Sequence, residues 1–223
     1  MTNFKRSVLL VLMLFPLVLM GQSKQDELAR LTEKADKHYN SLQSMRSHFT
    51  EEYHGAGMSR SESGMLYLKK PGKMRWDYEQ PRKKLFLSDG KTAWFYVPGE
   101  QQARKAPVSK LDDIRSPLRF LLGKTKLRKE FSELGIAPNI RAHVAGDIVL
   151  RGSPKGMEDR VSLVILEITP EGRIDRIEIE EVDGALTDFR FTDAAENVPV
   201  ADNLFHFTPP AGVEVVEGTD LGN

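Results

Sequence analysis

The sequence has no cysteine among its 223 residues. This absence excludes disulfide bonds, thiolate metal sites and a cysteine nucleophile. Histidine is also scarce, and the five histidines are scattered at positions 38, 48, 54, 143 and 206, with no pair at the spacing of metal ligands. We therefore expect no metal site and no chemistry that depends on a thiol.

Motifs for covalent catalysis and nucleotide binding are missing as well. No Gly-x-Ser-x-Gly elbow is present, and Gly55 and Gly57 lack the third glycine of a dinucleotide-binding fingerprint. The neighbouring carboxylates Asp112 and Asp113 form a possible acid–base pair, but adjacent loop carboxylates are more often solvated or capping groups. A triad built from distant residues stays open. Otherwise these absences predict a protein that is not an enzyme and that uses no cofactor.

An excess of charge of either sign is lacking too. The chain has 32 Lys and Arg residues against 32 Asp and Glu residues. Domains that bind nucleic acid present a broad basic surface to the phosphates. The balanced composition therefore predicts no nucleic-acid partner.

One long apolar run does occur, at the N-terminus. Lys5 and Arg6 precede an apolar stretch over residues 7–20, which has the length of a signal-peptide core and is too short to span a bilayer comfortably. The alternative interpretation is an N-terminal anchor that is not cleaved. The order of a basic segment and a short apolar core favours an exported protein.

The residues that follow the apolar run set the expected cleavage site. Gly21 and Ser23 are small, which favours cleavage after Ser23, with cleavage after Gly21 as the alternative. We predict a signal peptide over residues 1–23 and a single domain over residues 24–223. No cysteine is available at the junction for lipid attachment, so we expect the mature chain to be soluble.

The start of the mature chain predicts a helix followed by a strand. Over residues 24–46, apolar side chains recur at steps of three and four, with charged residues between them. Residues 47–54 follow as a first predicted strand. Leu42, Met45 and Phe49 lie where the helix gives way to the strand, so they could also contact a ligand.

Residues 64–97 predict an antiparallel meander around which the rest of the chain is organised. Four short apolar runs alternate here with turn signals, and Asp89-Gly90 is a strong hairpin signal. Met74 and Trp76 alternate with charged residues, which is typical of a strand with one buried face. From the residues alone, Trp76 and Trp94 are interpreted as core residues.

The second half of the chain predicts more sheet. In residues 173–182, Ile177 and Ile179 alternate with Arg176 and Glu178, which indicates one wet face. Before these strands, residues 109–123 form a lid candidate with two short helical turns. The predicted strands of this half are 140–151, 160–169, 173–182 and 185–192.

Two segments of the meander, GMLYLKKPGKMRWDYEQP and LFLSDGKTAWFYVPGEQQA, resemble the periplasmic lipoprotein carrier family, the LolA-type proteins. The family pattern is a strand ending in Lys-Arg-Pro, an aromatic strand, and then Ser-Asp-Gly-Lys-Thr before a second aromatic strand. The similarity extends from the N-terminal helix to the sequence Phe207-Thr208-Pro209-Pro210. It is weakest over residues 124–160.

The resemblance implies a fold and a function. The fold is mostly β, a single antiparallel sheet curled into an incomplete barrel and closed by the N-terminal helix and the short lid helices. The implied function is that of a soluble periplasmic chaperone, which shields lipoprotein acyl chains in a hydrophobic cavity and carries them from the inner to the outer membrane. The implied partners are an inner-membrane ABC-type lipoprotein-releasing complex and an outer-membrane receptor, with the carrier itself a monomer.

The resemblance also implies which residues contact the acyl chains. A pocket lined by rings, Leu and Met suits such chains, because it replaces water without demanding directional partners. The family closes its lid with an Arg before the proline of the first segment, and here that position is Lys70, which lacks the planar fork of Arg. The residues expected to bind lipid are Leu42, Met45, Phe49, Leu66, Leu68, Met74, Trp76, Trp94, Leu118, Leu121 and Leu122.

Two other functions stay open at this point. A half-barrel of this kind could serve as a lipid- or lipoprotein-sensing regulatory domain, although such a protein should carry a second domain. An envelope lipid hydrolase is the other alternative, and it should show an activated nucleophile. Neither feature is present in the sequence, so the carrier is the preferred interpretation.

Overall fold

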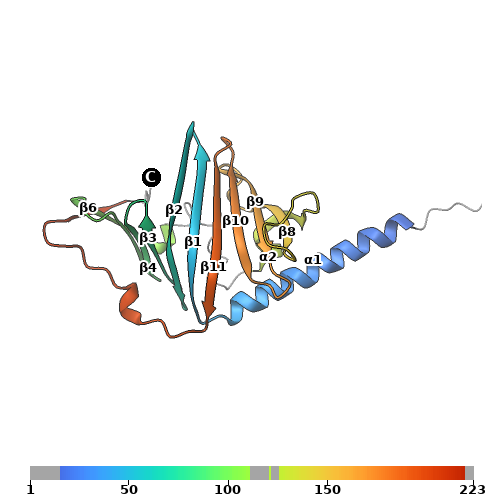
Figure 1. The fold of residues 1–223 in the computed structure, drawn as a ribbon, viewed down its shortest axis with the longest axis horizontal. Helices are drawn as coiled ribbons and strands as arrows, with labels where there is room; N and C mark the ends of the chain where they lie inside the picture. The colour runs from blue at the N-terminus through green and yellow to red at the C-terminus, as the bar shows by residue number, and fades with distance from the viewer. Residues whose placement is uncertain (1–15, 111–120, 122–125, 219–223) are drawn as a thin grey trace, which may run out of the picture.

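The computed structural model describes residues 16–110, 121 and 126–218, with side chains placed for these residues except 16–23 and Lys110. Within this part, one 12-stranded sheet dominates the molecule (Figure 1), in the order β12-β6-β5-β4-β3-β2-β1-β11-β10-β9-β8-β7. All neighbouring strands are antiparallel except β12 and β6. Because β12 and β7 are the two edges and are not paired with each other, the sheet is open, which confirms the mostly β, unclosed fold.

The elements of the N-terminal half follow one another along the chain. They are α1 (Pro16–Ser41), β1 (Ser44–Gly55), β2 (Met58–Lys69), β3 (Lys73–Gln80), β4 (Lys84–Asp89), β5 (Thr92–Tyr96), β6 (Gln102–Pro107) and the 3-10 turn η1 (Val108–Lys110).

The C-terminal half adds the remaining strands. They are preceded by α2 (Leu127–Glu130) and comprise β7 (Phe131–Ile136), β8 (Ile148–Pro154), β9 (Val161–Ile168), β10 (Ile174–Glu181), β11 (Leu186–Glu196), the 3-10 turn η3 (Asp202–Phe205) and β12 (Glu214–Glu217).

The predicted hairpin at Asp89-Gly90 forms for a local reason. The carboxylate Oδ1 of Asp89 accepts hydrogen bonds from the backbone N–H groups of Lys91 at 2.8 Å and Thr92 at 2.7 Å. Gly90 takes the left-handed conformation, with φ of +94°, which glycine adopts without steric cost. The turn therefore joins β4 to β5 and fixes their register.

Side chains alternate between two faces of the sheet. In β1, Met45 and Phe49 are buried while His48 and Thr50 between and beyond them are exposed. We call the face that carries Met45 and Phe49 the inner face, because α1 packs on it, and the opposite face the outer face.

The helix α1 covers part of the inner face. Its stripe of Leu28, Leu31, Ala35 and Tyr39 is buried in the same hydrophobic cluster as the inner-face residues of the sheet. The N-terminal part of α1 extends beyond the sheet (Figure 1). No helix in the part of the chain described here combines the length and the apolar character that a membrane span requires.

Polar bonds tie α1 to both the sheet and α2. The backbone N–H of Ile174 donates to the Tyr39 hydroxyl at 2.9 Å, and the Lys34 ammonium donates to the Pro170 carbonyl at 2.8 Å. The N–H of Leu127 donates to Asp36 at 2.9 Å. Burial raises the pKa of the Tyr39 hydroxyl above its usual range, so this group stays neutral as a hydrogen-bonding partner.

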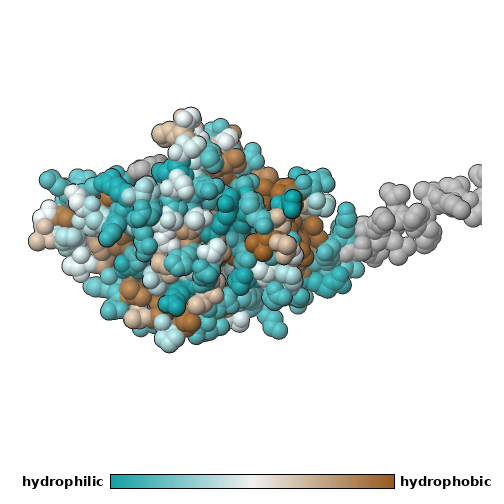
Figure 2. Space-filling model, viewed as in Figure 1, coloured by the Kyte–Doolittle hydropathy of each residue, from teal (hydrophilic) through white to brown (hydrophobic). Residues whose placement is uncertain are grey.

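The outer face is covered by two other segments. Val200 and Phe205 of the C-terminal segment are buried, and η3 contacts β3 and β4. At the other side of the sheet, Ala137, Val149 and Ile165 form a second, smaller cluster. Figure 2 shows mainly polar residues on the visible surface, with apolar residues in small separate groups.

Several predicted boundaries differ from the structure. The helix predicted over 24–46 ends at Ser41, and β1 starts at Ser44, because the backbone from Ser44 onward pairs with β2 and β11 on either side. The strand predicted over 140–151 begins only at Ile148, while β7 and α2 were not predicted. The strand β12 falls in what the sequence indicates is a polar tail, and it pairs in parallel with β6.

The predicted wet face of residues 173–182 is wrong for Arg176. Its side chain is buried on the outer face, where Glu167 lies at 3.1 Å and Asp188 at 2.8 Å. Alternation with isoleucines indicates that a residue faces away from the inner cluster. It does not reveal that partners on neighbouring strands bury the charge.

Candidate functional site

The centre of the inner face is a cluster of aromatic rings. Trp76 is fully buried, and its ring lies 4.6 Å from that of Phe49 and 5.5 Å from that of Phe189, measured between centroids. Phe191 adds a further ring at 6.1 Å. Such edge-to-face contacts join β1, β3 and β11 across the middle of the sheet.

A glycine in β2 lets two of these rings meet. Gly64 lies between Phe49 of β1 and Tyr78 of β3 in the register of the sheet, and the two rings approach to 4.9 Å across it. A Cβ at Gly64 would come within 1.9 Å of the Asp77 carbonyl oxygen. Only glycine therefore permits this close passage of β3 beside β2.

Most of the residues predicted to bind lipid lie together in this cluster. All are buried, on the inner face or at the C-terminal end of α1, and they come from segments far apart in the sequence. They are Leu42, Met45, Phe49, Leu66, Leu68, Met74, Trp76 and Leu121.

Trp94 is the exception among the described residues. In the register, Trp94 lies opposite Leu87 and Lys105. Its neighbour Phe95 continues the row of Trp76 and Phe86, and its neighbour Ala93 continues the row of Met74 and Ser88. The Trp94 ring packs 5.4 Å from that of Phe207 in the C-terminal segment. Trp94 therefore lies on the outer face, away from the other residues that were predicted to bind lipid.

Leu118 and Leu122 lie outside the described residues, as does most of the predicted lid over 109–123. Leu121 is described and is 1% exposed, within the inner-face cluster.

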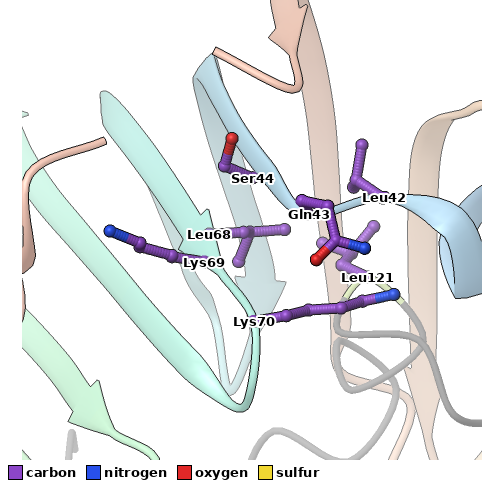
Figure 3. A pocket seen from close by; sticks show the side chains of 7 residues that line it. All are labelled: Leu42, Gln43, Ser44, Leu68, Lys69, Lys70 and Leu121. Carbon is purple, nitrogen blue, oxygen red and sulfur yellow. The ribbon is translucent and has the colours of Figure 1, made fainter. Parts of the chain in front are cut away.

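A small pocket opens where α1 meets the ends of β1 and β2 (Figure 3). Its volume of about 10 Å³ is room for roughly one water molecule. The described apolar residues of the inner face are buried against one another and against α1. The pocket is lined by Leu42, Gln43, Ser44, Leu68, Lys69, Lys70 and Leu121.

Lys70, the predicted latch, lies at this pocket. Its ammonium donates to the carbonyl oxygens of Tyr39 at 2.6 Å and Asn40 at 2.8 Å, in the last turn of α1. A cation there also complements the negative end of the helix dipole. Among the described residues, Lys70 therefore holds the end of α1, while most of the predicted lid over 109–123 lies outside the described part.

Lys69, the neighbour of Lys70, has a different role. Its ammonium donates to the Val200 carbonyl at 2.7 Å and lies 3.3 Å from the Asp202 carboxylate, both in the segment that covers the outer face. Neighbouring positions in a strand point to opposite faces. The sequence does not distinguish the two lysines, but in the structure Lys69 bonds to the segment on the outer face and Lys70 to the end of α1.

The sequence did not reveal a group of paired charges on the inner face. Glu51 and Glu62 are only 8% and 5% exposed, and they lie directly opposite each other in β1 and β2. Strand spacing could have found them, because Glu51 is two residues from Phe49 and must share its face.

The buried indole of Trp76 also carries a polar atom. Within the described residues, its Nε1–H has no hydrogen-bond acceptor. An unsatisfied buried donor costs free energy. The same apolar cluster therefore contains one donor that a polar atom of a ligand would satisfy.

The fold and this face define a class of protein. An open antiparallel sheet with an apolar inner face, covered by an N-terminal helix and without a metal cluster among the described residues, is suited to hold an apolar ligand. Residues 40–208 match the family described as "Outer membrane lipoprotein carrier protein LolA", so the chain belongs to that family.

Curated relatives agree with this assignment. An outer-membrane lipoprotein carrier protein of Nitrosospira multiformis is 33% identical over 161 residues, covering 70% of this chain and 73% of the relative. A carrier of the same name from Methylococcus capsulatus is 28% identical over 209 residues, covering 92% of this chain and 96% of the relative. The homologues are thus named as carriers, not as enzymes.

Solved structures agree with the fold. An uncharacterized conserved protein of Thermus thermophilus superposes with a TM-score of 0.57 at 12% identity, covering 86% of this chain and 99% of that protein. The Mycobacterium tuberculosis lipoprotein LppX gives a TM-score of 0.50 at 14% identity, covering 79% and 98%. At these identities the similarity concerns the fold alone.

Proposed function

We propose that the protein is a periplasmic chaperone that shields the acyl chains of lipoproteins on its inner face and carries them from the inner to the outer membrane. The observation that carries this proposal is the single apolar cluster that runs from α1 over the inner face of the sheet. It is large, free of directional bonds at its aromatic centre, and closed from water.

The energetics fit a carrier. Exposing an acyl chain to water costs about 0.8 kcal/mol per CH₂ group. The pocket described above offers about 10 Å³ of free space. A chain that enters there would replace contacts between α1, Leu121 and the sheet. This exchange of apolar contacts keeps the net affinity below the full burial energy, which permits release.

The chains would enter at the pocket beside Lys70. Leu42, Leu68 and Leu121 leave space between them there. Inside, the free Nε1–H of Trp76 could donate to an ester carbonyl of the lipid. Binding and release need no covalent chemistry.

The proposed partners follow from the direction of transport. An inner-membrane ABC-type complex would load the carrier by using ATP, and an outer-membrane receptor would accept the cargo. Each transfer moves acyl chains between two apolar environments, so neither step exposes them fully to water.

The proposed location requires export. With cleavage after Ser23, α1 would begin at Lys24, and among the described side chains its buried stripe begins at Leu28. The mature helix would therefore keep this described stripe. Mass spectrometry of the periplasmic fraction should give an N-terminus at Lys24, and a full-length mass in the membrane pellet would contradict export as a cleaved protein.

The decisive experiment incubates the mature protein with inner-membrane vesicles, ATP and a labelled lipoprotein. We expect ATP-dependent appearance of the label in the supernatant, bound to the protein. Leu121→Glu places a charge in the roof of the pocket and should reduce capture. Met58→Glu is the control, because Met58 is 64% exposed at the tip of the β1–β2 hairpin. If wild-type protein captures no label, the carrier function is excluded.

A further inference from the structure

Five side chains form a closed polar network on the inner face of β1–β4. The Tyr78 hydroxyl donates to Glu51 at 2.6 Å, and the Lys84 ammonium donates to Glu62 at 2.5 Å. Arg60 Nε lies 3.2 Å from Glu62, and Arg60 Nη2 lies 3.8 Å from Glu51. Two carboxylates and two cations make the network neutral. We call these five residues the charged wall.

The charged wall adjoins the apolar cluster. Going along β1 from the pocket, the inner-face positions are Met45, Ser47 and Phe49, and the next is Glu51. The ring of Tyr78 contacts that of Phe49 at 4.9 Å, so this one side chain faces apolar rings on one side and ion pairs on the other. The apolar surface of β1–β4 therefore ends at Tyr78.

The other half of the sheet has no such barrier on its described inner face. At the level of Glu51, the register leads across β11, β10 and β9 to Phe189, Ile177 and Leu166. At the next inner-face position of β1, Tyr53, the register leads through Thr187 of β11 to the apolar residues Ile179 of β10 and Val164 of β9.

A bound acyl chain would meet different environments on the two halves. Over β9–β11 it can keep replacing apolar contacts with apolar contacts. At the charged wall it would have to part Glu51 from Tyr78 or Glu62 from Lys84, and leave a buried charge without its partner. Replacing a buried ion pair such as Glu62–Lys84 by apolar residues of similar volume is often neutral or stabilising, so the pair is weak evidence for a role in fold stability.

We propose that the charged wall closes the far part of β1–β4 to acyl chains and directs their methyl ends over β9–β11. This inference rests on the proposed function, because it concerns where a bound chain lies. The five residues would act as positioning residues that set the path of the chain, without being required for its capture.

The test uses a fatty acid that carries a photoactivatable diazirine at its methyl end. After equilibrium binding is measured, the wild-type protein is irradiated and the cross-linked peptides are identified by mass spectrometry. We expect labels in β9–β11, near Val164, Ile177 and Ile179, and none at Tyr53 or Arg60.

A variant then removes the wall. Glu51→Met, Arg60→Met, Glu62→Met and Lys84→Met together keep side-chain length and remove every charge. We expect labels to appear at Tyr53 and in the β1–β2 hairpin, with equilibrium binding retained. The matched control carries Glu52→Met and Arg190→Met. These two residues form an ion pair of 3.4 Å on the outer face, next to Glu51 in β1. The control should keep the wild-type labelling pattern.

The outcomes separate the two proposals. If the wild-type protein binds no fatty acid, the carrier function itself fails and the wall has no role. If it binds but labels Tyr53 or the β1–β2 hairpin, only the wall is refuted. The same conclusion follows if the folded fourfold variant keeps the wild-type pattern. Should that variant fail to fold, the wild-type pattern still decides.

Discussion

The two faces of the same sheet bury their residues by different means. On the inner face, Phe49, Trp76 and Phe189 pack through rings that demand no fixed partner. On the outer face of the same region, Arg176 is held by Glu167 and Asp188 through directional bonds. Non-directional contacts can be exchanged for those of another apolar molecule, whereas a bonded charge cannot leave its partners without a large cost. Under the proposed function, the inner face is the surface that accepts cargo and the outer face only supports it.

The largest expected effect is a loss of stability caused by a substitution on the outer face. Arg176→Met removes the cation that Asp188 and Glu167, itself 1% exposed, share. We expect a loss of about 3–5 kcal/mol in the free energy of unfolding, measured with urea, because a buried charge stays uncompensated.

The control for this change is Arg82→Met. Arg82 pairs with Glu100 while 61% exposed, so its loss should cost at most about 1 kcal/mol. Affinity for an acyl probe, corrected for the folded fraction, should be unchanged in both variants. Weaker probe binding by folded Arg176→Met would show that the two faces are not independent.

The second prediction concerns a substitution on the inner face. Met74 is 5% exposed within the cluster, so Met74→Glu puts a carboxylate among apolar groups. We expect a destabilisation of at least about 2 kcal/mol and weaker binding of a fluorescent acyl probe. Met58→Glu, at an exposed methionine, should change neither. Normal probe affinity in folded Met74→Glu would place the acyl chains elsewhere.

The third prediction concerns the edge of the inner face at Lys70. Lys70→Leu removes two bonds to the end of α1, and we expect a loss of about 1–3 kcal/mol in stability and impaired hand-over of cargo. Lys70→Arg should retain the bonds and release cargo more slowly, because the guanidinium can donate to several carbonyls at once. If both variants release cargo at the wild-type rate, Lys70 has no role in holding or releasing cargo.

The smallest effect is a pH dependence of the outer face. Burial acts to raise the pKa of Glu167, but the bonds from the His143 side chain and backbone, with the charges of His143 and Arg176, hold it below its usual value of 4.5. A carboxyl with a lowered pKa stabilises the fold above its unfolded-state pKa and loses this contribution as the pH falls through the folded-state pKa.

We therefore expect the free energy of unfolding to drop as the pH falls below about 4.5. His143→Ala should make this drop shallower, because two of the groups that favour the ionised carboxylate are weakened or lost. Urea titrations over an acidic pH series measure the slope. An identical slope in both proteins would assign the acid sensitivity to other carboxylates.

Much of the fold could be predicted from local patterns. The alternation around Met74 and Trp76 and the Asp89-Gly90 turn reflect interactions within a few residues, so the meander was recovered. Met45 shows the limit of this approach. Its spacing from Phe49 fits a helix as well as a strand, and only pairing with β2 and β11 decides for the strand.

The site was recovered in part for the same reason. Trp76 and Trp94 look alike in the sequence, yet the register places them on opposite faces. The outcome for Trp94 depends on Phe207, more than a hundred residues later, which covers it. The charged wall was missed because its neutrality exists only once β1, β2, β3 and β4 are assembled.

Tyr39 connects the two halves of the sheet through a single residue of α1. Its hydroxyl accepts from Ile174 in β10, while its carbonyl accepts from Lys70 just after β2. The last turn of the helix therefore bridges the two strands, and the distance between the hydroxyl and the carbonyl of Tyr39 limits how far they can spread apart. Moving the end of α1 away from the sheet would break both hydrogen bonds of Tyr39. The position of α1 and the curvature of the sheet are therefore linked.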